Sequence, residues 1–107
     1  MNIKEINCQT LKNWLENDQV ILIDVREIEE NKAARIKGSI LIPLGSISLD
    51  KIPALSEKKL VMQCRSGKRS ASACEKLLTE NPNLDIYNLE GGIIAWSSCN
   101  YPIDNNQ

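Results

Sequence analysis

The chain has 107 residues, of which 42% are hydrophobic and 25% are charged. This length suffices for one modest hydrophobic core and is too short for two, so we expect a single domain over residues 1–103 and a polar tail over residues 104–107. Thirteen basic and fourteen acidic side chains leave a formal net charge of -1. Such a balance gives no overall attraction to nucleic acid or to an anionic membrane, and neither is expected as a partner.

The chain contains no histidine, and this absence excludes several kinds of chemistry. A Ser-His-Asp triad, a Cys-His dyad and a histidine-ligated zinc site all require that residue. No two of the four cysteines form a Cys-x-x-Cys pair, which argues against zinc ribbons and thioredoxin-like redox motifs. We therefore expect no metal site.

Nothing in the sequence indicates export or membrane insertion. The N-terminal residues lack the pattern of a signal peptide. The longest aliphatic run, residues 20–23, is far shorter than the roughly 20 residues that cross a bilayer. We expect a cytoplasmic protein whose cysteines are reduced.

Hydrophobic runs alternate with stretches of helical periodicity along the whole chain. The expected strands are residues 3–6, 20–23, 40–42, 60–62 and 85–89. The expected helices are residues 10–17, 27–34, 70–80 and 93–98, with a turn or short helix over 46–52. Asn100 can end the last helix in the left-handed conformation. This alternation predicts an α/β domain with a parallel sheet covered by helices.

Residues 64–70 carry the clearest chemical signal, because they lead from a buried strand through a glycine turn into a helix. Ligands of open α/β sheets bind beyond the carboxyl ends of the strands. A helix that begins there presents unpaired N–H groups and the positive end of its dipole. These groups stabilise a thiolate, so we expect them to lower the pKa of Cys64 and to activate it without a general base. Gly67 lets successive N–H groups converge on one point.

Three cations lie in this loop, although the chain as a whole is slightly acidic. Arg65 and Arg69 offer donors arranged to match oxyanions, and Lys68 adds a mobile point charge. Ser66 and Ser70 can add hydroxyl donors. Taken singly, such residues more often mark a solvated helix start, and a cysteine after a strand is more often a small buried side chain. Their combination between a strand and a helix predicts a site for a small anionic substrate.

Three segments of the chain together resemble the rhodanese-like (sulfurtransferase) family. Residues 64–70 match its active-site loop, residues 23–27 and 36–43 its Asp-Val-Arg and Ile-x-Gly-Ala-x-x-Ile-Pro segments, and residues 89–96 its Gly-Gly-x-x-Ala-Trp signature. The resemblance implies a three-layer α/β/α rhodanese-like fold with a five-stranded parallel sheet of order 3-2-4-5-1. It also places Asp24 and Arg26 near the loop as supporting residues, for which a structural ion pair is the more common role.

The chain departs from the family pattern at a few positions. Ala34 and Arg35 stand where the family usually has Gly-His, and Asn31 stands where an aromatic residue is common. None of these positions carries the sulfur chemistry, so we expect altered packing or surface rather than lost activity. Small buried or half-buried packing residues, rather than redox thiols, are expected at the remaining cysteines, Cys8, Cys74 and Cys99.

The resemblance implies a sulfurtransferase that moves a sulfane sulfur from thiosulfate or a persulfide donor to a thiophilic acceptor. Cys64 is then the catalytic nucleophile, which carries the sulfur as a persulfide, and no metal or organic cofactor is required. The substrate-binding and anion-binding residues are Arg65, Ser66, Gly67, Lys68, Arg69 and Ser70. The expected partners are a small anionic sulfur donor and, as acceptor, cyanide, a thiol or a protein.

Other functions stay open at this point. A sulfur-carrier module that relays persulfide between proteins needs the same activated Cys64. A phosphatase or arsenate reductase of the same fold needs a loop one residue longer, with arginine six positions after the cysteine, where this chain has Ser70. The shorter loop closes too tightly for a phosphate beside the sulfur, so this alternative is less favoured. Catalytically silent relatives typically lose the cysteine, which this chain retains.

Overall fold

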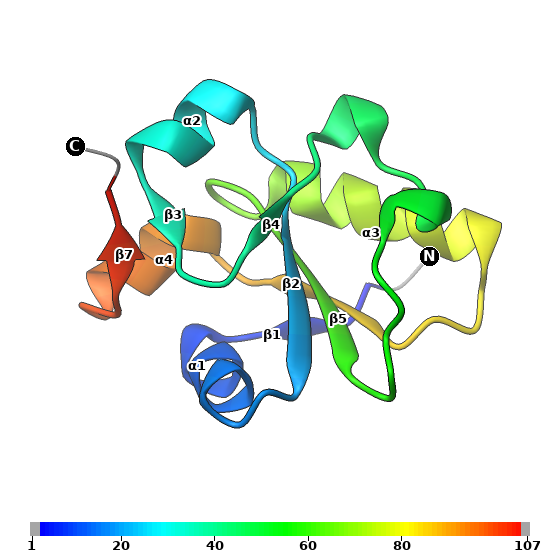
Figure 1. The fold of residues 1–107 in the computed structure, drawn as a ribbon, viewed down its shortest axis with the longest axis horizontal. Coiled ribbons are helices and arrows are strands. Elements are labelled where there is room, and N and C mark those ends of the chain that lie inside the picture. Colours follow the sequence, from blue (N-terminus) through cyan, green and yellow to red (C-terminus); the bar gives the residue numbers. More distant parts are fainter. Residues whose placement is uncertain (1–2, 106–107) are drawn as a thin grey trace.

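The computed structural model describes residues 3–105 and is built around a five-stranded parallel sheet (Figure 1). The strands of this sheet are β1 (Glu5–Ile6), β2 (Val20–Asp24), β4 (Ile40–Leu41), β5 (Lys59–Gln63) and β6 (Ile86–Leu89). They lie in the order β1-β6-β5-β2-β4, and every neighbouring pair is parallel. Numbered within this sheet and read from the β4 edge, the order is 3-2-4-5-1, which confirms the topology implied by the resemblance.

Helices cover both faces of the sheet and complete the three layers. They are α1 (Cys8–Glu16), α2 (Ile28–Ala33), α3 (Lys68–Glu80) and α4 (Gly92–Ser98), with 3-10 turns at Leu44–Ser46 and Leu49–Lys51. α1 and α4 pack on one face, and α3 packs on the other together with the two turns. Within residues 3–105, no helix combines the length and the apolar character that a membrane span requires.

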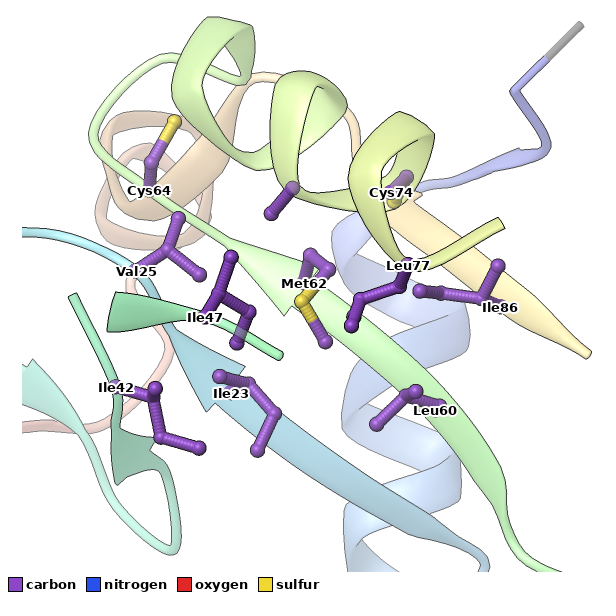
Figure 2. Packing of buried hydrophobic residues seen from close by; sticks show 11 residues of the cluster. Ile23, Val25, Ile42, Ile47, Leu60, Met62, Cys64, Cys74, Leu77 and Ile86 are labelled. Atoms are coloured by element: carbon purple, nitrogen blue, oxygen red, sulfur yellow. The ribbon is translucent and has the colours of Figure 1, made fainter. Parts of the chain in front are cut away.

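The two central strands are apolar on both faces, which buries them between the helix layers. Leu60 and Met62 of β5 point into the cluster beneath α3 (Figure 2), whereas Val61 between them faces α1 and α4. Side chains of a strand alternate between faces, so one aliphatic run contributes to two cores. β2 behaves in the same way, and its pairing with β5 sets Asp24 opposite Gln63. The carboxyl ends of these two strands therefore lie side by side.

Two helices begin two residues earlier than the hydrophobic periodicity predicts. α1 gains its first residues because the Asn7 side chain accepts the Thr10 backbone N–H at 2.9 Å and caps the helix. α3 begins at Lys68 rather than at residue 70, because Gly67, with φ of 109°, already turns the chain into the helix. Asn100 has the left-handed conformation expected after the last helix, with φ of 60°.

A two-stranded antiparallel sheet, β3 (Arg35–Ile36) with β7 (Ile103–Asp104), is absent from the sequence prediction. Asp104 was expected in the polar tail and instead pairs within this sheet. The segment is held in place because the Trp96 indole donates a hydrogen bond of 2.8 Å to the Pro102 carbonyl. Asn105 follows outside any strand, and residues 106–107 of the expected tail lie outside the described residues.

All four cysteines are free. Cys8 and Cys74 are buried, which confirms the prediction that these two side chains are buried. The prediction is wrong for Cys99, which is exposed because it lies at the C-terminal cap of α4, where the chain leaves the helix. Burial, with a contribution from Cys99, raises the pKa of Cys8 to about 11, and burial raises the pKa of Cys74 to about 12. Both are therefore protonated near neutral pH.

Candidate active site

Residues 64–70, called the Cys64 loop below, leave the carboxyl edge of the sheet directly after β5, and the last three of them begin α3. Backbone hydrogen bonds extend the pairing of the strands to this edge: Val25 N–H donates to the Gln63 carbonyl at 2.9 Å, and Ile42 N–H donates to the Asp24 carbonyl at 2.9 Å. Cys64 therefore lies beside the segment that follows β2, as the strand order implies.

Cys64 lies at the base of this loop and is 1% exposed. Its sulfur points away from the core side chains and toward the loop that leads into α3 (Figure 2). The sulfur accepts the Gly67 backbone N–H at 3.1 Å and lies 3.3 Å from the Ser70 hydroxyl oxygen. The loop thus converges on one sulfur atom.

Two opposing effects set the acidity of Cys64. Burial raises its pKa, but hydrogen bonds outweigh burial and leave the pKa below its ordinary value of 9.0. The donors are the Ser70 hydroxyl and the backbone N–H groups of Ser70, Gly67 and Ser66. Hydrogen bonds to the charged form favour the thiolate over the thiol. The direction agrees with the expectation that the loop activates Cys64 without a general base.

α4 fixes the first part of the loop through its backbone. Ile93 N–H donates to the Cys64 carbonyl at 2.9 Å, and Ile94 N–H donates to the Arg65 carbonyl at 3.2 Å. This close approach requires Gly92, because a Cβ there would lie 2.5 Å from the Cys64 carbonyl oxygen. Gly92 also has φ of 58°, which favours glycine. The Gly-Gly pair of residues 89–96 therefore serves the Cys64 loop as well as the start of the helix.

The three cations of the loop have different surroundings. Arg65 and Lys68 are exposed, and neither has an ion-pair partner within residues 3–105. Arg69 instead makes two hydrogen bonds to the Glu30 carboxylate of α2, at 2.7 and 2.9 Å. Ser66 is exposed, whereas Ser70 is buried. Anion binding by these residues stays a prediction, and in this conformation the Arg69 guanidinium already has an internal partner.

Asp24 and Arg26 form a buried ion pair next to the loop. Arg26 Nη2 lies 2.8 Å from Asp24 Oδ2, and the two side chains are 5% and 0% exposed, respectively. Arg26 Nη2 also donates to the Ala34 carbonyl at 2.7 Å, and Asn31 donates to Asp24 at 3.0 Å. Asn31 and Ala34, two of the departures from the family pattern, thus contribute to this network. Within the described residues, no group of three or more cysteine or carboxylate side chains is placed so that it could hold a metal ion.

Sequence reasoning missed three residues of this region: Glu5, Glu30 and Asn88. Glu30 was assigned only to a charged helix, although it holds Arg69. Asn88 lies on β6 with 1% exposure, accepts a hydrogen bond from the Ser70 hydroxyl, and donates to the Gly67 carbonyl at 3.1 Å. Glu5 on β1 accepts from Asn88 at 3.0 Å. A polar residue within the apolar run of residues 86–89 is the one sequence signal that pointed to Asn88.

Comparison with known proteins agrees with this geometry. The model of the family described as "Rhodanese-like domain" matches residues 7–99. The "Putative sulfurtransferase YtwF" of Bacillus subtilis is 38% identical over 104 residues, which cover 95% of this chain and 98% of that protein. The "Sulfurtransferase" of Allochromatium vinosum is 31% identical, and the match covers 94% of each chain.

A solved structure extends the likeness to three dimensions. The crystal structure of a rhodanese-related protein from Thermoplasma volcanium superposes with a TM-score of 0.80 at 32% sequence identity. The match covers 94% of this chain and 97% of that one. Since the family model spans every strand of the main sheet except β1, together with the Cys64 loop and all of α4, this chain belongs to the rhodanese-like domain family.

Proposed function

We propose that the chain is a sulfurtransferase of the thiosulfate type, which carries a sulfane sulfur as a persulfide on Cys64. Membership of the family, with relatives named as sulfurtransferases and one named as a sulfur carrier, supports a sulfurtransferase or sulfur-carrier role. The observation that carries the proposal is the sulfur of Cys64, which accepts the Gly67 N–H within a loop that lowers its pKa.

The first half-reaction loads the cysteine. The Cys64 thiolate attacks the outer sulfur of thiosulfate and forms a new S–S bond. The S–S bond of thiosulfate breaks, and sulfite leaves with the bonding electron pair. The outer sulfur keeps the negative charge that it carried in thiosulfate, and the negative charge of the thiolate appears on the departing sulfite, so charge is conserved. Backbone N–H groups of the loop, aimed at the sulfur, stabilise this charge.

The second half-reaction unloads the cysteine. A nucleophilic acceptor, cyanide or a thiolate, attacks the outer sulfur, and the Cys64 thiolate leaves. The two steps share one covalent intermediate, so the kinetics are ping-pong. A hollow of about 360 Å³ beside the loop is lined by Arg65 and by apolar side chains that include Ile93, Ile94 and Ile103. Its apolar surface suits the carbon part of a thiol acceptor.

The exposed cations give the site its preference for an anionic donor. Arg65 and Lys68 present charge to solvent next to the buried sulfur. An arginine fork matches the geometry of a sulfonate, and a lysine adds charge without fixed geometry. We assign the binding of the sulfonate end and of the departing sulfite to these two residues, with Arg69 behind them.

The test compares wild type, Cys64→Ser and Cys99→Ser, incubated with thiosulfate and cyanide. Thiocyanate is expected from wild type and from the exposed-cysteine control, and none from Cys64→Ser. Intact mass after thiosulfate alone should show one added sulfur atom that cyanide removes. The protein is also incubated with a phosphate monoester, which should stay intact.

Three results would speak against the proposal. Cleavage of the phosphate ester would assign the loop to phosphoryl chemistry. Thiocyanate from Cys64→Ser at the wild-type rate would exclude Cys64 as the carrier. A persulfide that forms from a protein donor, but never from thiosulfate, would make the chain a sulfur carrier rather than a thiosulfate enzyme.

A further inference from the structure

The side-chain amide of Asn88 has a fixed orientation behind the catalytic loop. Its nitrogen donates to Glu5 Oε2 at 3.0 Å and to the Gly67 carbonyl at 3.1 Å, which uses both amide hydrogens. Rotation of the amide would set its oxygen against these two acceptor oxygens. The amide oxygen therefore faces Ser70, whose hydroxyl donates to it.

Ser70 lies between two acceptors and has one proton to give. Its oxygen is 3.3 Å from the Cys64 sulfur and in hydrogen-bond contact with the Asn88 amide oxygen. A hydroxyl donates one hydrogen bond only. Ser70 is fully buried, so solvent does not supply a second donor from its side.

Every acceptor in the chain from Cys64 through Ser70 to Asn88 receives a hydrogen bond only when Cys64 is a thiol. The S–H then donates to the Ser70 oxygen, and Ser70 donates to Asn88. When Cys64 is a thiolate, that S–H is gone, and the Ser70 proton serves either the sulfur or the Asn88 oxygen. An unpaired buried acceptor costs free energy, so the thiolate state is one hydrogen bond short.

A persulfide removes this conflict. The sulfur atom of Cys64 itself then carries neither a proton nor the negative charge, which lies on the outer sulfur. Ser70 can donate to Asn88, while the Gly67 N–H stays at the Cys64 sulfur as in the structure. Among the forms of Cys64 without a proton, the loaded one fits this network best.

We propose that Asn88 is a positioning residue that draws the Ser70 proton away from the Cys64 sulfur and so disfavours the free thiolate relative to the thiol and the persulfide. The part that concerns the persulfide rests on the proposed function. The competition for one proton exists in any reaction of Cys64. Asn88 thereby limits how far the loop lowers the pKa of Cys64 and favours retention of the bound sulfur.

Substitutions of Asn88 and Ser70 leave the charged side chains around Cys64 unchanged. Two exposed cations lie at the loop, and the Asp24–Arg26 pair lies at the end of β2 and in the segment after it. The Arg69–Glu30 pair joins α3 to α2, and Glu5 of β1 contacts the site through Asn88. The charged side chains that surround Cys64 on these elements are Asp24, Arg26, Glu30, Arg65, Lys68, Arg69 and Glu5. The test therefore changes only the neutral side chains Asn88 and Ser70, with one variant of Glu5 as a control.

The experiment measures the rate of Cys64 alkylation by iodoacetamide against pH, read by peptide mass so that Cys99 does not interfere. Ser70→Ala removes the hydroxyl donor and should move the midpoint up by about one pH unit. Asn88→Leu, of similar size, leaves the Ser70 proton for the sulfur and should move it down by about as much. The Gly67 carbonyl keeps the Ala71 N–H as a donor at 3.2 Å, so the turn retains a partner. Glu5→Gln retains an acceptor for Asn88 and should leave the midpoint unchanged.

The opposite signs separate this role from a structural one. If Asn88 only held the loop in shape, its loss would scatter the N–H donors and raise the midpoint, as in Ser70→Ala. An upward shift, or no shift, in Asn88→Leu overturns the proposal. Asn88→Ala, which also removes the acceptor, repeats the test should the leucine variant not fold. In mixtures of thiosulfate and sulfite, a several-fold smaller fraction of Asn88→Leu than of wild type should carry the persulfide, as measured by intact mass. Failure of wild type to form thiocyanate would refute the proposed function and leave the alkylation result valid.

Discussion

Gly92 lies in contact with the backbone of Arg65, so close that no side chain fits between them. A Cβ on Gly92 would lie 2.6 Å from the carbonyl carbon of Arg65 and nearer still to its oxygen. The obstacle is backbone, which cannot move aside as the end of a flexible side chain can. The fit between α4 and the Cys64 loop therefore depends on the absence of a side chain at Gly92.

Gly92→Ala should disturb both stability and sulfur transfer. The left-handed backbone alone costs a non-glycine residue about 1–3 kcal/mol, and the clash with the loop adds to that. We expect a lower urea midpoint and loss of most thiocyanate formation, because Ile93 and Ile94 can no longer hold the loop carbonyls. Gly45→Ala is the control, since a Cβ there meets nothing within 4 Å. Equal urea midpoints for Gly92→Ala and wild type would contradict this assignment.

The Asp24–Arg26 pair should matter far more than an exposed ion pair. Asp24→Asn keeps the shape but leaves the buried Arg26 guanidinium without a counter-charge, which costs about 3–5 kcal/mol. The same substitution at Asp18 breaks its exposed pair with Lys58, and we expect a cost below about 1 kcal/mol. Urea unfolding of both variants checks this. Similar losses of unfolding free energy in Asp24→Asn and Asp18→Asn would show that the buried pair stabilises the fold no more than the exposed pair does.

Local patterns were enough to predict where the candidate site lies. A cysteine, a glycine and three cations between a strand and a helix are contiguous in the sequence, so the site of Cys64 could be predicted without the fold. The strand order came from the family resemblance, since alternation alone predicts a parallel sheet but not which strands are neighbours. β3 and β7 escaped prediction because each pairs a single isoleucine with a charged residue and therefore forms no hydrophobic run.

Contacts between distant segments account for the rest. Asn88 reaches Ser70 because β6 lies beside β5, and Glu5 reaches Asn88 because β1 pairs with β6. The pairing of Arg69 with Glu30 depends on where α2 lies relative to the loop. Each of these contacts is set by tertiary packing, which one sequence does not specify residue by residue.

The Arg69–Glu30 pair predicts a specific dependence of stability on pH. Hydrogen bonding to Arg69 outweighs burial and lowers the pKa of Glu30 from 4.5 to about 2. A carboxyl whose pKa is lowered by folding stabilises the folded state at every pH above the pKa that it has in the unfolded chain. This contribution is lost as the pH falls from about 4.5 toward 2. Because the two side chains are 35% and 30% exposed, screening limits the effect to about 1 kcal/mol.

Glu30→Gln isolates this charge. Glutamine can still accept the Glu27 backbone N–H and so retain the cap of α2. We expect the variant to be less stable than wild type by about 1 kcal/mol at pH 7, and the difference to shrink steadily below about pH 4.5. Urea unfolding over this range measures it. Glu29→Gln, on the exposed side of the same helix, is the control. A difference that stays constant to pH 3 would be inconsistent with titration of Glu30.

The exposed cations of the loop should act on the binding of the donor rather than on the chemical step. Arg65→Gln and Lys68→Gln each remove one charge that faces solvent beside the buried sulfur. We expect each to raise the KM for thiosulfate about three- to tenfold, with kcat changed less, since each charge is screened by water. The effect should shrink as salt is added. Lys76→Gln, at an exposed position further along α3, should leave KM unchanged. Equal effects at Lys68 and Lys76 would mean that the loop has no local preference for anions.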